Sequence, residues 1–289
     1  MPELPEVEVV KRSLVKNIQN LAIKKVKIND SNLRYKVNKD AIFKLIGKKI
    51  EKIERRSKFI IFRVGKDFVI LVHLGMTGKF FFVDKKRKKY KTSFYYELNE
   101  KKDLKHDRII FFLENNQKLI YNDVRKFGFI KVYRCIDPNN TKHLSNLGPE
   151  PFDKNYNYNY LRKYISGRNR TIKDILMDQK CIAGLGNIYV NEILFESGIK
   201  PHRKVKKLKN LEIIKIIKNT KKILRNSIKL GGSSIKDFSS SDGKKGAFQQ
   251  HLKVYGREGE SCSNTDCNKR VVKKVISNRS SFFCISCQK

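Results

Sequence analysis

Four of the six cysteines are clustered near the carboxyl end of this 289-residue chain. Cys262 and Cys267 are separated by four residues, and Cys284 and Cys287 by two. Two such pairs supply four thiolates, the ligand set of a tetrahedral structural zinc ion. Two disulfides are the alternative, but nothing else in the sequence is typical of a secreted protein. We therefore expect one zinc ion per chain. The remaining cysteines are expected to be buried thiols: Cys135 and Cys181.

Between the two cysteine pairs, the sequence predicts a β-hairpin with strands over Val271–Ile276 and Ser280–Phe283. Arg279 lies near its tip, where a guanidinium group can bind a phosphate through two hydrogen bonds. A solvated arginine is the alternative, and position alone does not separate the two. So small a module has little apolar core, and metal binding is expected to supply most of its folding free energy.

A pair of glycines, Gly184 and Gly186, precedes a predicted helix that begins near Asn187. Gly184-Leu185-Gly186 invites comparison with a dinucleotide-binding loop, but the third glycine of that fingerprint would fall at Tyr189. The preceding segment, Thr171–Met177, also has helical rather than strand periodicity. What remains is a helix, two tight turns and a second helix beginning near Asn187. Backbone N–H groups at that second helix, with the Asn187 amide, can bind a phosphate. A plain N-cap is the alternative role for Asn187.

The amino terminus predicts an amphipathic helix. Its apolar residues recur every three or four positions and so share one face: Leu4, Val7, Val10, Leu14, Ile18 and Leu21. Pro5 suits the first helical position, and Glu6 and Glu8 favour the positive end of the helix dipole. Glu6 is expected to orient the start of the helix. Pro2 and Glu3 lie just outside it, where they are placed for chemistry rather than for packing.

The composition indicates a polyanionic partner. The chain has 65 Lys and Arg against 28 Asp and Glu, a net charge of +37. A nucleotide bias of the source genome is the alternative explanation, and charge alone also fits a ribosomal or membrane-surface protein. Apolar residues make up 39% of the chain, which excludes a wholly disordered basic tail. No apolar run is long enough for a membrane span, and no secretory signal is recognisable. We expect a soluble intracellular protein that handles nucleic acid.

Hydrophobic periodicity divides the chain into a β part, an α part and the cysteine-bearing tail. Residues 23–133 are expected to form antiparallel strands of a sandwich or barrel. The clearest strands form two hairpins, Phe59–Val64 with Phe68–Leu74 and Arg108–Glu114 with Lys118–Tyr121. The lysine-rich stretch Lys85–Lys91 is expected to be a solvated loop. Helical periodicity then runs from about Tyr156 to Leu230, followed by a Ser/Gly-rich loop over Ser239–Gly246.

Six short blocks occur in an order typical of one enzyme family. They are Met1–Glu8 (MPELPEVE), His73–Gly78 (HLGMTG), Asp123–Gly128 (DVRKFG), Gly184–Tyr189 (GLGNIY), Val254–Arg257 (VYGR) and Cys284–Lys289 (CISCQK). By these blocks the chain resembles bacterial formamidopyrimidine-DNA glycosylases, which remove oxidised purines such as 8-oxoguanine. The resemblance spans residues 2–289.

The resemblance implies a multidomain α+β fold. Residues 2–134 are expected to form an antiparallel β-sandwich with the N-terminal helix, as the catalytic domain. Residues 135–256 are expected to form a helix–two-turn–helix domain that includes the lesion loop, and residues 257–289 a zinc ribbon. DNA is expected in the cleft between them. The implied partner is duplex DNA with an oxidised purine opposite cytosine, bound by a monomer in the bacterial cytoplasm, at the nucleoid.

The resemblance also implies catalytic roles. Pro2, exposed once Met1 is removed, is expected to attack the sugar C1′ as a nucleophile, with Glu3 as general acid/base. The resulting iminium is an electron sink that permits β-elimination and then δ-elimination. Lys58 is implied as the proton donor for β-elimination and as a phosphate contact. Arg279 is implied as a donor for δ-elimination, although a guanidinium rarely gives up a proton and phosphate binding is the safer role.

A base inside a duplex must be flipped out, and the space that it leaves must be filled. The resemblance implies that Met76, Arg125 and Phe127 fill this space, with Arg125 reading the orphaned cytosine. Without the resemblance, Met76 and Phe127 would be interpreted as core residues. Further DNA contacts are implied for His106, Arg168, Asn187 and Lys236, and Ser239–Gly246 resembles the loop that closes over the lesion.

The chain departs from the family pattern in the cysteine tail. Its first cysteine pair has four intervening residues where the family usually has two, and Asn268 replaces the common glycine after the second cysteine. The lysine-rich loop is also extended. Two further functions remain open: a pyrimidine-specific, endonuclease VIII-like glycosylase, which tends to carry Gly where this chain has Leu4, and a catalytically silent DNA-binding protein.

Overall fold

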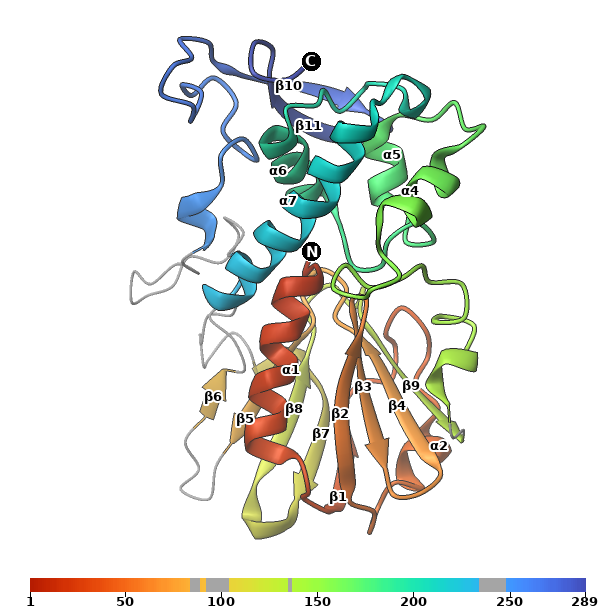
Figure 1. The fold of residues 1–289 in the computed structure, drawn as a ribbon. Helices are drawn as coiled ribbons and strands as arrows, with labels where there is room; N and C mark the ends of the chain where they lie inside the picture. The colour runs from red at the N-terminus through yellow and green to blue at the C-terminus, as the bar shows by residue number, and fades with distance from the viewer. Residues whose placement is uncertain (84–88, 92–103, 135–136, 234–247) are drawn as a thin grey trace. The chain divides into compact units, whose positions relative to one another are not determined.

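The computed structural model describes residues 1–83, 89–91, 104–134, 137–233 and 248–289 (Figure 1). The chain divides into two compact units. The first comprises residues 1–145 and 230–249, and the second residues 146–229 and 250–289. Among the described residues, no helix is both long and apolar enough to cross a membrane.

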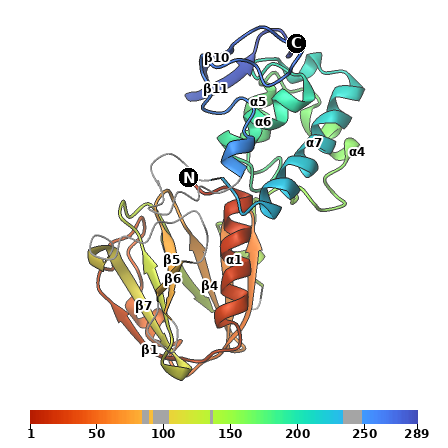
Figure 2. The ribbon, with the colours of Figure 1, turned by 90° about the vertical axis from the view of Figure 1, so that its left-hand side faces the viewer.

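The N-terminal helix α1 (Leu4–Ile18) begins one residue earlier than the sequence predicts. Glu3 is its N-cap, so Pro5 occupies the second helical position, where its missing N–H is equally harmless. The predicted apolar face is buried, from Val7 through Ile18, and it joins the core of the first unit. Figures 1 and 2 show α1 running alongside the strands of this unit.

Two antiparallel sheets form the rest of the first unit, as a β-sandwich. One has the order β2-β3-β4-β9, with bounds Ile50–Arg56, Phe59–Val64, Phe68–His73 and Phe129–Arg134. The other has the order β1-β7-β8-β5-β6, with bounds Ile23–Ile28, Asp107–Leu113, Lys118–Asn122, Lys79–Val83 and Lys89–Lys91. Side chains of both sheets meet in one apolar core, for example Phe62 and Ile70 with Phe80 and Phe111. Helix α2 (Lys39–Phe43) lies between β1 and β2 and so connects the two sheets, and short 3-10 turns occur at Leu104–His106, Glu114–Asn116 and Pro138–Asn140.

Both predicted hairpins are confirmed. Strands β3 and β4 pair in register from Phe59↔His73 to Val64↔Phe68, and β7 pairs with β8 across the turn at Asn115. The prediction for the lysine-rich stretch is wrong in part. Lys89–Lys91 forms strand β6, which pairs with β5 from Val83↔Lys89 to Phe81↔Lys91, because backbone pairing with a neighbouring strand does not require apolar side chains. Residues 85–88 lie outside the described part of the chain.

The second unit holds the predicted helices and the cysteine-bearing hairpin. The helices are α4 (Tyr158–Ile165), α5 (Ile172–Met177), α6 (Asn187–Ser197) and α7 (Asn210–Lys229), with 3-10 turns at Val205–Lys207 and Phe248–His251. Helix α6 is buried on nearly every side, because it packs against α5, α7 and strand β11. Strands β10 (Val271–Ile276) and β11 (Arg279–Cys284) form the predicted hairpin (Figure 1). Arg279 pairs with Ile276 at its tip.

Candidate active site and metal centre

The residues at the amino terminus are held by a reciprocal helix cap. The backbone N–H of Glu3 donates to Glu6 Oε2 at 2.8 Å, and the Glu3 side chain accepts the backbone N–H of Glu6. The other Glu6 oxygen accepts the backbone N–H and the hydroxyl of Ser233 at 2.9 and 3.0 Å. Glu6 therefore orients the helix start, as predicted, and Pro2 and Glu3 are buried beside it.

Lys58 lies in the turn that joins β2 to β3 of the same unit. Its neighbour Ser57 has a positive φ of 56°, which makes the turn tight, and the Lys58 side chain is buried. Arg55 ties this turn to the first turns of α1, because it donates to Glu8 Oε2 at 2.9 Å and to the Ser57 carbonyl at 3.0 Å. The structure thus connects the segment that carries Lys58 with the helix that carries Glu3.

Met76 lies in the turn after β4, and Arg125 and Phe127 lie in the loop between β8 and β9. Met76 is 37% exposed and Phe127 46%, so the interpretation of both as core residues is wrong. The Arg125 guanidinium stacks over the Phe127 ring at 4.5 Å, and the Arg125 backbone N–H donates to Thr77 Oγ1 at 3.0 Å. The fold therefore brings the three predicted residues together, with two apolar side chains in solvent.

His73, at the end of β4, supports the turn that carries Met76. Its Nδ1 accepts the backbone N–H of Gly75 at 3.0 Å, which requires a neutral ring. Burial, and after it the nearby charge of Lys58, lower the pKa of His73 to about 4. His106, a predicted DNA contact, is half-buried in the 3-10 turn directly before β7, and its Nδ1 lies 3.2 Å from Arg108 Nη2.

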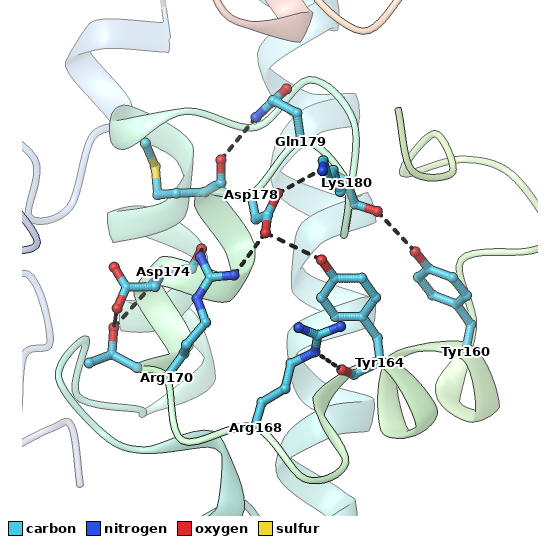
Figure 3. Close-up of polar contacts among 10 residues, drawn as sticks. Tyr160, Tyr164, Arg168, Arg170, Asp174, Asp178, Gln179 and Lys180 are labelled. Atoms are coloured by element: carbon cyan, nitrogen blue, oxygen red, sulfur yellow. Dashed lines mark hydrogen bonds and ion pairs between the residues drawn. The ribbon is translucent and has the colours of Figure 1, made fainter. Parts of the chain in front are cut away.

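Arg168 belongs to the second unit, in the loop between α4 and α5 (Figure 3). Its guanidinium lies over the Tyr164 ring at 4.4 Å, and its Nε donates to the Tyr164 carbonyl. Figure 3 also shows Arg170 bonded to Asp178, whose carboxylate accepts the Tyr164 hydroxyl as well. These contacts fix the loop and leave Arg168 on the surface, where a cation is accessible to an anion.

Asn187 is the first residue of α6, and of the two tight turns predicted before it, at Gly184 and Gly186, only the one at Gly184 is confirmed. Gly184 needs its positive φ of 94°, whereas Gly186 is extended and is the N-cap, so the N-cap interpretation of Asn187 is wrong. The Asn187 amide instead donates to the Ser280 carbonyl at 2.9 Å. Asn187 therefore joins the helix to the tip of the hairpin.

Lys173, on α5, is a residue that the sequence analysis missed. Its ammonium donates to the carbonyl of Ser280 at 3.1 Å and to the hydroxyl of Ser281, and it lies 3.4 Å from the Arg279 carbonyl. Burial, and after it the Arg279 guanidinium, lower the pKa of Lys173 to about 8. Lys173 thus holds the backbone from which the exposed Arg279 side chain extends. A lone lysine in a short amphipathic helix gave no signal of this role.

Glu192 is a second missed residue. It is buried in α6, and its carboxylate accepts the backbone N–H groups of three consecutive residues, Lys253 to Tyr255, at 2.8 to 3.0 Å. Burial raises the pKa of Glu192. The carboxylate fixes the segment that leads into the cysteine tail. Its position within the most apolar part of α6, between Val190 and Ile193, was the one signal in the sequence that could have indicated this role.

The four cysteine sulfurs of the tail converge. All lie within 4.8 Å of one another, with Cys262 and Cys287 3.7 Å apart and Cys267 and Cys284 3.6 Å apart. These distances are too long for disulfides, whose S–S bond is about 2.05 Å, so the disulfide alternative is wrong. A tetrahedron with Zn–S bonds of about 2.3 Å has edges of about 3.8 Å, so the thiolates fit a zinc ion.

The longer cysteine loop does not disturb this arrangement. Asn264, inside the loop, donates from its side chain to Cys287 Sγ at 3.6 Å, and its backbone N–H bonds the Cys262 sulfur. Cys181 is buried away from the cluster, and burial raises the pKa of its thiol to about 12. Cys135, Lys236 and the Ser239–Gly246 loop lie outside the described residues.

Comparisons with known proteins agree with this arrangement. The formamidopyrimidine-DNA glycosylase N-terminal domain model matches residues 1–130, and the H2TH domain model of the same enzymes matches residues 147–239. The formamidopyrimidine-DNA glycosylase of Roseobacter denitrificans is 36% identical over 289 residues, with both chains fully covered. That of Rickettsia massiliae is 38% identical over 288 residues, covering 100% of this chain and 97% of the relative.

Solved structures show the same likeness. Lactococcus lactis Fpg in complex with an abasic-site DNA has a TM-score of 0.84 and 32% identity, with 99% of each chain covered. MutM in complex with DNA containing carbocyclic 8-oxo-G has a TM-score of 0.85 and 32% identity, with both chains fully covered. Matches over the whole chain in sequence, fold and motif order lead to one conclusion: the chain belongs to the formamidopyrimidine-DNA glycosylase family.

Proposed function

We propose that the protein is a bifunctional DNA glycosylase and abasic-site lyase of base excision repair, which excises oxidised purines from duplex DNA. Family membership over the full chain supports the substrate class. The observation that carries the mechanism is the amino terminus, where a proline and a carboxylate lie side by side at a capped helix start. An endonuclease VIII-like or silent binding role has no comparable support.

The chemistry begins once Met1 is removed, which gives Pro2 a free secondary amine. An α-amino group has a pKa of about 7.7 to 8.0, so a useful neutral fraction exists at neutral pH. The amine attacks the sugar C1′, the bond to the damaged base breaks, and the base leaves with its electron pair and a proton. The amine then loses its proton, and the C1′–O4′ bond opens as O4′ takes up a proton, which leaves a cationic iminium at C1′. The iminium accepts the electrons released when a C2′ proton is removed, and the 3′ phosphate departs with the electrons of its C–O bond.

Glu3 is proposed as the general acid/base that moves these protons. Its carboxylate lies at the helix start directly after Pro2, where it accepts the backbone N–H of Glu6, and a carboxyl group beside the nucleophile can exchange protons with the sugar or the base. Lys58 is proposed as a phosphate contact and as the donor for β-elimination, in the turn that Arg55 ties to α1. Arg279 is proposed as a phosphate contact, because a guanidinium keeps its proton.

The remaining residues are proposed to bind and read the duplex. Met76, Phe127 and Arg125 project from neighbouring loops and would fill the space of the flipped base, with Arg125 reading cytosine. His106, Arg168, Asn187 and Lys236 are proposed as further contacts. The four cysteines would hold one zinc ion, which would fold the hairpin and so present Arg279. We retain the domain divisions at 134 and 256, a monomeric state and a bacterial cytoplasmic location at the nucleoid as proposals.

Borohydride trapping tests the mechanism. The protein is incubated with an 8-oxoguanine:cytosine duplex and sodium borohydride, and we expect a covalent adduct whose tryptic peptide begins at Pro2. Pro2→Gly should reduce adduct formation and base release on the order of a hundredfold. Lys222→Met, a change of an exposed lysine on α7, is the control and should trap normally.

The opposite results are equally informative. Normal trapping by Pro2→Gly would refute the proline nucleophile. Intact DNA binding with no adduct would favour a silent binder, provided that the mass of the amino terminus shows Met1 removed. Faster trapping on an oxidised pyrimidine than on 8-oxoguanine would favour the endonuclease VIII-like alternative.

A further inference from the structure

Asp123 is a buried carboxylate that the proposed mechanism does not use. It lies at the end of β8, and its side chain is completely shielded from solvent. Oδ1 accepts the Thr77 hydroxyl at 2.5 Å, and Oδ2 accepts the Gly128 backbone N–H at 2.8 Å. A buried carboxylate is costly to desolvate unless it is bonded in this way. Its position therefore depends on these donors.

The donors of Asp123 come from two different loops. Thr77 follows Met76 in the turn after β4, and Gly128 ends the loop that carries Arg125 and Phe127. The same Thr77 hydroxyl that donates to Asp123 also accepts the Arg125 backbone N–H at 3.0 Å. One hydroxyl thus bridges the carboxylate and the backbone of the arginine.

Close packing of the two loops supports this bridge. Gly75 has a positive φ of 63°, and a Cβ there would lie 2.4 Å from the Gly128 nitrogen and the Phe127 carbonyl carbon. A Cβ on Gly128 would lie 2.0 Å from the Tyr121 hydroxyl. Real Cβ atoms do not approach so closely, so the loops touch backbone to backbone. This close packing leaves little room for one loop to move independently of the other.

We propose that Thr77 is a positioning residue for opposite-base specificity, acting through Arg125. Asp123 and the Thr77 hydroxyl hold the Arg125 backbone at a fixed place relative to Met76, so that the arginine and the apolar side chains enter the duplex as one body. A guanidinium that reads a base must be placed within a few tenths of an ångström, because its hydrogen bonds are directional. This inference rests on the proposed function of Arg125.

The test compares excision of 8-oxoguanine opposite cytosine and opposite adenine in single-turnover reactions. Thr77→Val keeps the shape of the side chain but removes both hydrogen bonds of the hydroxyl. We expect it to reduce the cytosine-to-adenine rate ratio about tenfold, the effect of losing one or two buried hydrogen bonds. Thr77→Ser should restore the ratio. Cleavage of an abasic site in single-stranded DNA, which has no opposite base, should stay within twofold of the unsubstituted protein.

Two controls separate positioning from general destabilisation. Thr141→Val removes another buried threonine hydroxyl of the same unit, which donates to the Pro138 carbonyl at 2.8 Å, and should leave the ratio unchanged. In an Arg125→Ala background, Thr77→Val should change the ratio by less than twofold, because the residue through which it acts is gone.

Several results would overturn the inference. These are an unchanged ratio in Thr77→Val, an equal loss in Thr141→Val, or a full further loss in the Arg125→Ala background. If Arg125→Ala alone leaves the ratio unchanged, the proposed reading role of Arg125 fails, and the inference fails with it. Loss of the single-stranded lyase activity in Thr77→Val would show a defect in the catalytic end instead.

Discussion

The two groups of candidate functional residues are supported in different ways. In the first unit, the loops that carry Met76 and Phe127 rest on a large apolar core shared by two sheets and α1. In the second unit, the hairpin that carries Arg279 has only a small apolar cluster, built around Phe195, Phe282 and two of the cysteines. The loops of the first unit are supported by the burial of many apolar side chains, whereas the hairpin needs other interactions to hold it in place.

Buried polar side chains supply much of this second support. Asn191 accepts the Phe282 backbone N–H at 2.7 Å, and Gln288 both accepts from Cys284 and donates to the Ile199 carbonyl. Lys173 and Asn187 bond the hairpin tip. Each such bond contributes only about 1 kcal/mol, but each leaves a costly unsatisfied group if it breaks. The small module is therefore specified largely by polar contacts, together with the proposed zinc ion, and the large one by its apolar core.

Removal of the proposed zinc ion is the strongest test of this difference in support between the sandwich and the hairpin. Metal binding in small zinc modules is worth on the order of 10 kcal/mol, so a chelator with a reducing agent should unfold the hairpin. We expect DNA affinity to fall about tenfold or more, since Arg279 loses its support. Circular dichroism in the β region should change little, because the sandwich is held by its apolar core. Melting of the sandwich together with the hairpin would contradict the independence of the two supports.

The substitution His73→Asn tests whether His73 makes the stability of the first unit depend on pH. The folded pKa of His73, about 4, lies below its unfolded value of about 6.5, so the unfolded chain binds more protons between these pH values. The free energy of unfolding should therefore fall by up to about 3 kcal/mol as the pH drops from 6.5 to 4. Asparagine keeps an acceptor for Gly75 but does not titrate.

The measurement is the melting temperature against pH for the two proteins. The variant should lose less stability than the unsubstituted protein over this window, and His251→Asn, at an exposed histidine, is the control. Identical slopes for the unsubstituted protein and His73→Asn would mean that His73 does not carry the acid sensitivity.

Lys173→Met tests the polar support of the hairpin tip with a smaller effect. The substitution leaves the Ser280 carbonyl without its ammonium donor, which should destabilise the tip by about 1 to 3 kcal/mol. Faster hydrogen exchange of the β10–β11 amides and several-fold weaker DNA binding are expected, with base-release chemistry at saturating enzyme unchanged. Lys222→Met, on α7, removes an equal charge at an exposed site and should do neither. Equal effects of both substitutions would indicate a loss of charge rather than of support.

The sequence predicted the features that depend on local pattern. The strand hairpins, the buried face of α1 and the cysteine cluster follow from spacing and turn residues, and each is confirmed. It did not predict the features that depend on distant partners. Lys89–Lys91 became a strand because β5 offers a free edge, and Lys173 became an anchor because the hairpin tip packs against α5. Neither partner can be recognised from the neighbouring sequence.

The exposure of two apolar side chains also could not be predicted from the local sequence pattern. Phe127 and Met76 are apolar residues between strands, a pattern that normally indicates the core, and only the resemblance to a family predicted them as surface residues. The two partners of the Glu6 carboxylate also could not be predicted, because one of them, Ser233, lies 227 residues away in the sequence.

That shared carboxylate has a consequence for the evolution of the chain. Glu6 serves the backbone of Glu3 with one oxygen and Ser233 with the other, and Gly232 leaves room for it, since a Cβ there would lie 3.1 Å from Glu6 Oε1. A substitution at either end removes an acceptor or a donor from the other. Among descendants of a common ancestor, positions 6 and 233 should therefore change together or not at all. The first residues of the chain thus share an evolutionary constraint with Ser233, which lies four residues after the end of α7.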